Sequence, residues 1–158
     1  MGICYSRNNS VNQTNPMSQH IEWEHTVPFI PPIQEGFVIK VYDGDTITIA
    51  TKLPYLESPL YRFQVRLNGI DSPEIKGKTD EEKEEAHKSK RALEALVLHK
   101  VVQLKNKKQE KYGRILADIY VKNLLNEDVY VNEWLIRQGF ALPYDGGTKF
   151  QTHPINSV

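Results

Sequence analysis

The chain lacks three features that would narrow its class at once: a set of cysteines, a long apolar run and a net charge. Its single cysteine, Cys4, excludes an internal disulfide framework and agrees with a reducing compartment. No apolar run approaches the roughly 18 residues of a transmembrane helix, and the N-terminus has no apolar core of a secretory signal. We therefore expect an intracellular protein without a signal peptide.

The charge balance gives no direct indication of a partner, because 20 basic residues offset 20 acidic residues. A nucleic-acid partner has to be argued from local clusters of side chains instead. A length of 158 residues with 39% hydrophobic residues is enough for one domain with a buried core. We expect this domain to be a monomer.

The N-terminal residues 1–32 differ in composition from the rest of the chain. They are rich in Asn, Ser and Gln and run into the Pro-rich stretch VPFIPPI, which disfavours both helix and central strand. We interpret them as a flexible arm. The start MGICYS matches the N-myristoylation pattern at Gly2, with Cys4 placed for palmitoylation. Two lipids would anchor the protein to the cytoplasmic side of a membrane, but so short a pattern also matches by chance.

The domain itself is expected at residues 33–150, with residues 151–158 as a tail. Its apolar periodicity and turn residues predict a mainly β domain in which a helix interrupts a series of strands. The expected elements are a hairpin over 37–50 with its turn at Asp43-Gly44, a strand over 61–70, a helix over 79–100, strands over 101–104 and 114–122, and a helix ending at Gln138. Five strands with a helix between the third and fourth is the order of an OB-fold. We therefore predict an α+β, mainly β fold: a five-stranded Greek-key barrel with two to three helices.

The stretch RLNGIDSPE at residues 66–74 places an arginine, an aspartate and a glutamate on a strand that we expect to break at Ser72-Pro73. Asp45 opens the second predicted strand and Arg114 the fifth, so the barrel could bring them to the same place. Carboxylate oxygens on turn-rich segments suit Ca²⁺, and planar guanidinium groups suit a phosphodiester. The residues alone leave two alternatives, a hydrolytic phosphodiester site or a set of ion pairs on the barrel rim.

Four motifs resemble, in order, those of the staphylococcal (thermonuclease) nuclease family: DGDT at 43–46, RLNGIDSPE at 66–74, KYGR at 111–114 and VNEWLIRQG at 131–139. The resemblance spans about residues 36–149. It implies a nuclease that uses one Ca²⁺ per domain. Such an endonuclease hydrolyses single-stranded or frayed DNA and RNA at the 5′ P–O bond and leaves 3′-phosphates.

The resemblance also implies which residues hold the metal. Asp45 and Asp71 match the calcium ligands, and Ser72 matches the position that contributes a backbone carbonyl. The family usually has Thr there, a difference that a carbonyl ligand tolerates. Asp43 matches an acidic position close to the metal.

The remaining roles concern the substrate. Arg66 and Arg114 match the two catalytic arginines, and Glu74 matches the general base. Another set of residues matches the nucleotide pocket: Lys111, Tyr112 and Tyr144.

The alternative to a nuclease is a non-catalytic nucleic-acid-binding or scaffold module on the same fold. Degenerate domains of this kind usually lack an arginine, the glutamate or an aspartate, and this chain has them all, which favours the enzyme. Only nine residues follow Lys149. We therefore expect no counterpart of the long C-terminal helix of the family's well-known members.

Overall fold

The strands build a barrel in a computed structural model that describes residues 20–147. Buried apolar side chains recur along each strand, as expected for a sheet with one face on a core. The long strands are β1 (Glu35–Val41), β2 (Thr46–Lys52), β3 (Leu60–Leu67), β5 (Val101–Gln109) and β6 (Ile115–Lys122). The short strands are β4 (Ile70–Asp71), β7 (Asp128–Tyr130) and β8 (Leu142–Pro143).

The five long strands close on themselves. β1 pairs antiparallel with both β2 and β5, β3 pairs with β2, and β6 pairs with β5. A parallel pairing of β3 with β6, with Val65 opposite Ile115, completes the barrel. This closed five-stranded barrel confirms the predicted mainly β, OB-type fold.

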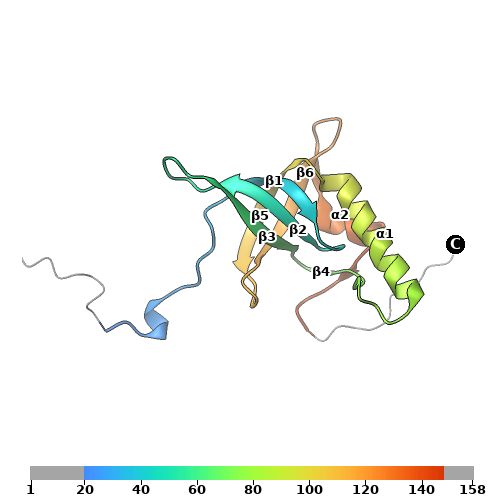
Figure 1. The fold of residues 1–158 in the computed structure, drawn as a ribbon, viewed down its shortest axis with the longest axis horizontal. Coiled ribbons are helices and arrows are strands. Elements are labelled where there is room, and N and C mark those ends of the chain that lie inside the picture. The colour runs from blue at the N-terminus through green and yellow to red at the C-terminus, as the bar shows by residue number, and fades with distance from the viewer. Residues whose placement is uncertain (1–19, 148–158) are drawn as a thin grey trace, which may run out of the picture.

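Two α-helices lie beside each other against the barrel (Figure 1). In α1 (Asp80–Val97), the predicted capping box is present, and the Glu82 amide donates to Thr79 Oγ1 at 3.2 Å. Helix α2 (Val131–Arg137) ends before Gly139, whose φ of 77° gives the expected left-handed C-terminus. A short 3₁₀ helix, η2 (Trp23–His25), precedes β1. No helix among residues 20–147 combines the length and apolar character that a membrane span requires.

The core fills the barrel and the space beneath the helices. Leu93 and Val97 of α1 and Leu135 of α2 are fully buried against it. The strands supply most of the rest, including Val38, Ile47, Ile49, Val65, Leu67, Val102 and Ile119. Packing of these β-branched and leucine side chains is the main source of stability of the domain.

Three predicted element ends differ from the structure by three residues or more. The third strand ends at Leu67 because Gly69 takes a φ of 74°, and only after this turn does β4 begin. Helix α1 ends at Val97 because His99 has a φ of 58°, which is not helical. Strand β5 runs for nine residues, through the lysines that we expected to end it, because its second half pairs with β6.

The chain before β1 is attached to the barrel. Pro31 and Ile33 are buried. Lys107 Nζ, on β5, donates to the carbonyl of Pro31 at 3.2 Å and also to that of Ile33. The end of the predicted arm is therefore held against β5, whereas Trp23 further upstream is 84% exposed.

Candidate active site

A cavity of about 700 Å³ opens where the start of β2, the link from β3 to β4 and the turn between β5 and β6 meet. All the predicted site residues within the described part of the chain line it: Asp43, Asp45, Arg66, Asp71, Ser72, Glu74, Lys111, Tyr112, Arg114 and Tyr144. The predicted lipidation positions Gly2 and Cys4 lie outside the described residues, so the lipid anchor stays a prediction. The structure thus brings together residues that are up to 101 positions apart in sequence, from Asp43 to Tyr144.

Arg66 joins two carboxylates at the floor of this cavity. Its Nη1 donates to Asp45 Oδ1 at 2.9 Å, and its Nη2 donates to Asp71 Oδ1 at 2.9 Å. Register explains the first contact, because Thr46 lies opposite Arg66 in the β2–β3 pair and Asp45 immediately precedes Thr46. The turn at Gly69 explains the second, because it brings Asp71 back beside Arg66. One guanidinium therefore bridges the two predicted metal ligands.

Asp45 is 2% exposed and is surrounded by donors. Besides Arg66, it accepts from Thr46 Oγ1 at 2.9 Å and from the Ser72 amide at 3.2 Å. Burial raises the pKa of Asp45 to about 6, and Asp43 adds to the rise, whereas Arg66 and the two hydrogen bonds lower it. The net rise means that this site favours added positive charge.

The loop carrying Asp43 and Asp45 packs closely against α1 and against Ser72. Asp43 Oδ1 accepts from the Asp45 amide at 3.1 Å. A Cβ on Gly44 would lie 2.0 Å from Ser89 Oγ of α1 and 2.8 Å from Ser72 Cβ. Gly44 lies in the predicted turn between β1 and β2, and a glycine is needed there for this close approach.

The segment after β4 carries Ser72 and Glu74 along the cavity wall. β4 pairs with β8, with Asp71 opposite Leu142, and the Tyr144 amide donates to the Gly69 carbonyl at 2.9 Å. Ser72 is buried, and the side chain of Glu74 is exposed at the cavity. Glu74 thus lies beside the Arg66 cluster but in contact with solvent.

Arg114 is held by Glu110, a residue that the sequence interpretation missed. Arg114 Nε donates to Glu110 Oε2 at 2.8 Å, and Nη2 donates to Oε1 at 2.7 Å. The contact raises the pKa of Arg114 and lowers the pKa of Glu110. A signal was available, because Glu110 stands four residues before Arg114 across the predicted Tyr112-Gly113 bend.

The predicted nucleotide-binding residues differ in their surroundings. Tyr112 is 73% exposed, and Lys111 Nζ lies 4.8 Å from its ring centroid. Tyr144 is tethered at its hydroxyl, which donates to the Gly147 carbonyl at 2.8 Å. Besides Glu110, four further lining residues were not predicted: Tyr42, Pro73, Ile75 and Lys76.

The donor set of the cavity fits a hard cation. Among residues 20–147 there is no group of three or more His, Cys, Asp or Glu side chains arranged to hold a metal. The residues predicted to hold the metal, Asp45, Asp71 and Ser72, all line the cavity and carry carboxylate or backbone oxygens. Ca²⁺ accepts such mixed oxygen ligands and completes its shell with water. Burial raises the pKa of Asp45 by disfavouring its ionised form, and a bound cation would stabilise that form.

Comparisons with known proteins point to a single family. The family model described as staphylococcal nuclease homologue matches residues 64–155. An uncharacterized endonuclease of Escherichia coli is 29% identical over 123 residues, which cover 78% of this chain and 67% of that protein. An uncharacterized endonuclease of Haemophilus influenzae is 35% identical over 109 residues, which cover 68% of this chain and 51% of that protein. An uncharacterized protein of Methanocaldococcus jannaschii is 33% identical over 129 residues, which cover 69% of this chain and 58% of that protein.

The matched regions span about half to two thirds of the length of these relatives. The family match covers more than half of this chain and includes every motif from β3 onward. With the closed barrel and the shared cavity described above, the conclusion is that this chain belongs to the staphylococcal nuclease homologue family.

Proposed function

We propose that the protein is a calcium-dependent nuclease that hydrolyses the 5′ P–O bond of single-stranded or frayed DNA and RNA and leaves 3′-phosphates. The observation that carries this proposal is the shared cavity: two arginines, five carboxylates and three tyrosines line one space of about 700 Å³. The endonuclease names of two relatives support the same reaction class.

The two arginines stabilise the negative charge of the phosphate. A phosphodiester gains negative charge on its non-bridging oxygens when water attacks, and preorganised donors stabilise that charge more in the transition state than in the ground state. Protein carboxylates hold each arginine through two of its nitrogens. Both cations are therefore positioned before the substrate arrives.

Glu74 activates the attacking water. Its exposed carboxylate lines the cavity beside Asp71 and Ser72, where it can accept a proton from water. The water oxygen forms the new bond to phosphorus, and the bond from phosphorus to the 5′-oxygen breaks. The 5′-oxygen leaves as a hydroxyl after taking up a proton, and the phosphate remains on the 3′ side.

Asp45, Asp71 and the carbonyl of Ser72 would hold the calcium ion. When bound, this ion supplies positive charge beside the phosphate. Tyr112 offers an exposed ring on which a base can stack. Overall neutrality of the chain means that these local groups, and not the net charge, attract the nucleic acid.

The products of digestion test the proposal. Single-stranded DNA and RNA of the same sequence, labelled at the 5′ end, are digested with calcium, and the new ends are identified by phosphatase and kinase treatment. We expect 3′-phosphate and 5′-hydroxyl ends from both substrates. Binding of these strands with no cleavage in calcium would instead establish the non-catalytic binding module.

A further inference from the structure

A second pocket adjoins the catalytic cavity. It has a volume of about 390 Å³ and shares Tyr112 and Arg114 with that cavity. Its size lies within the range of about 300–1,000 Å³ that is typical of small-ligand sites. A strand bound at the catalytic cavity can therefore continue into this pocket across Tyr112 without leaving the surface.

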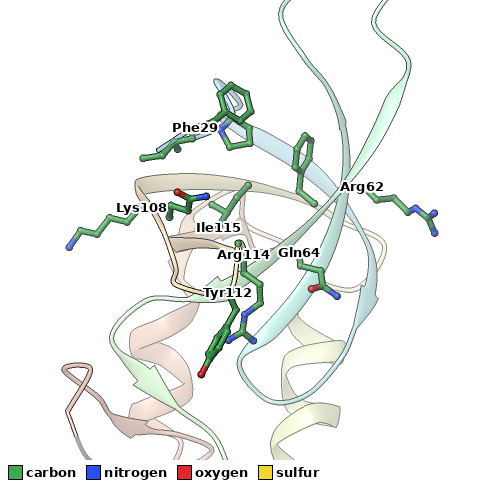
Figure 2. A pocket seen from close by; sticks show the side chains of 12 residues that line it. Phe29, Arg62, Gln64, Lys108, Tyr112, Arg114 and Ile115 are labelled. Carbon is green, nitrogen blue, oxygen red and sulfur yellow. The ribbon is translucent and has the colours of Figure 1, made fainter. Parts of the chain in front are cut away.

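The segment before β1 builds one wall of this pocket. Phe29, Ile30 and Pro31 line it from that segment, and Lys107 fixes the segment to β5 through the Pro31 and Ile33 carbonyls. Phe29 is 68% exposed although it lies at a pocket mouth. Figure 2 shows its ring on the opposite side of the pocket from Tyr112, with Ile115 between them. Two exposed aromatic rings thus mark the two ends of the pocket.

The pocket is positively charged within a neutral chain. No Asp or Glu is among its lining residues in the described part of the chain, whereas Arg62, Lys108 and Arg114 are. Arg114 is paired with Glu110, so Arg62 and Lys108 supply the positive charge. Arg62 comes from β3 and Lys108 from β5, and both are exposed. In Figure 2 they stand on opposite sides of the pocket, with their charged ends directed outward. Exposed cations that flank an aromatic pocket suit a phosphate backbone running past a stacked base.

We propose that this pocket is a second nucleotide subsite. The single strand that leaves the catalytic cavity stacks a base on Phe29, and Arg62 and Lys108 contact its phosphates. This inference rests on the proposed function, because the occupant is the same nucleic-acid substrate. It assigns a role in substrate binding to the N-terminal segment, which lies outside the barrel.

The test compares strand lengths. Binding of fluorescent single-stranded DNA of two and of eight nucleotides is measured by anisotropy in EGTA, where cleavage does not interfere. The variants are Phe29→Ala and the double variant Arg62→Ala with Lys108→Ala. Matched controls are Trp23→Ala, an 84% exposed aromatic of the same segment, and Arg91→Ala, an exposed arginine of α1.

We expect the wild type to bind the longer strand more tightly than the shorter one. Each pocket variant should reduce this affinity ratio at least fivefold, and the controls should leave it unchanged. The double variant should also lower the slope of log affinity against log salt concentration by about 1.4, because each of the two lost phosphate contacts contributes about 0.7 on a single strand. Loss of packing alone would not produce this effect. Circular dichroism of each variant confirms that the barrel is folded.

A ratio that stays the same in both pocket variants would overturn the subsite, as would equal binding of both lengths by the wild type. Failure of the proposed function has a different signature: the wild type would then leave both strands uncleaved in calcium. Cleavage with no length dependence therefore rejects only the subsite.

Discussion

Glu110 binds one edge of the Arg114 guanidinium through two hydrogen bonds. The two hydrogen bonds use Nε and Nη2 of Arg114, at 2.8 and 2.7 Å, so Nη1 is the nitrogen that does not contact Glu110. The hairpin that joins the two residues is closed by backbone bonds from the Glu110 amide to the Arg114 carbonyl and from the Gly113 amide to the Glu110 carbonyl, both 2.9 Å. Glu110 thus acts as a positioning residue for Arg114.

Glu110→Ala should lower kcat on single-stranded DNA by about three- to tenfold, because the guanidinium loses its orientation but stays in the cavity. Arg114→Ala should lower kcat by at least about tenfold. The double variant should be no slower than Arg114→Ala alone, since Glu110 works through Arg114. Multiplied losses in the double variant would show that Glu110 acts independently of Arg114.

Arg66→Ala separates charge stabilisation from metal binding. The variant removes a cation that contacts both Asp45 and Asp71, so its affinity for calcium should equal or exceed that of the wild type. Cleavage should nevertheless fall by at least about tenfold. Calcium affinity is read from the rise in melting temperature with calcium concentration. Weaker calcium binding in this variant would mean that Arg66 mainly orders the metal ligands. Arg66→Lys, which keeps the charge but not the planar fork, is the matched control.

Glu74→Gln should lower turnover by at least about tenfold while the barrel stays folded, because the amide cannot accept a proton from water. Binding of single-stranded DNA should change by less than about twofold, since Gln keeps the size and hydrogen-bonding reach of the side chain. Glu127→Gln, an exposed residue of the loop between β6 and β7 that does not line the cavity, serves as the control. Full turnover in Glu74→Gln would remove this residue from the mechanism.

Calcium affinity should depend on pH through Asp45. Calcium needs the ionised carboxylate, so its apparent affinity should fall by up to about tenfold per unit as pH drops below about 6, and should be constant above it. The stability of the metal-free protein should change with pH in the opposite direction. The folded-state pKa lies above the usual 3.8, so Asp45 contributes stability below about pH 4 that is lost as pH rises through 6. Melting temperatures measured with and without calcium from about pH 3.5 to 7.5 cover both effects, and Asp45→Asn should remove them.

The parts of the fold that sequence reasoning predicted are those with strong local signals. Thr79 and Glu82 start α1 where the capping box placed it, and Gly139 ends α2 as expected. The errors occurred where tertiary pairing decided the outcome. The lysines of β5 suggested a loop, but their backbone pairs with β6, and their side chains reach solvent or, in Lys107, the carbonyls before β1. At Gly69 the Asn-Gly pair was a turn signal that the apolar pattern around it concealed.

The sequence predicted which residues form the site, but not the hydrogen bonds between them. Motifs named Arg66, Asp71 and Arg114, and the structure places them on one cavity. The motifs did not indicate that Arg66 would bridge two carboxylates or that Glu110 would hold Arg114. Those contacts depend on strand register and on a tight turn, which side-chain identity alone does not determine. The wall formed by Phe29 depends on where the N-terminal segment meets β5, which the sequence does not specify.

The central claim is that the cavity around Arg66 and Arg114 hydrolyses phosphodiesters with calcium. The most direct measurement is the rate of cleavage of a single-stranded DNA substrate by the wild-type protein in calcium, in magnesium and in excess EGTA. We predict rapid cleavage in calcium and none above background in EGTA, with the activity restored when calcium is added back. Undiminished cleavage in EGTA, or no cleavage in calcium by the folded protein, would contradict it.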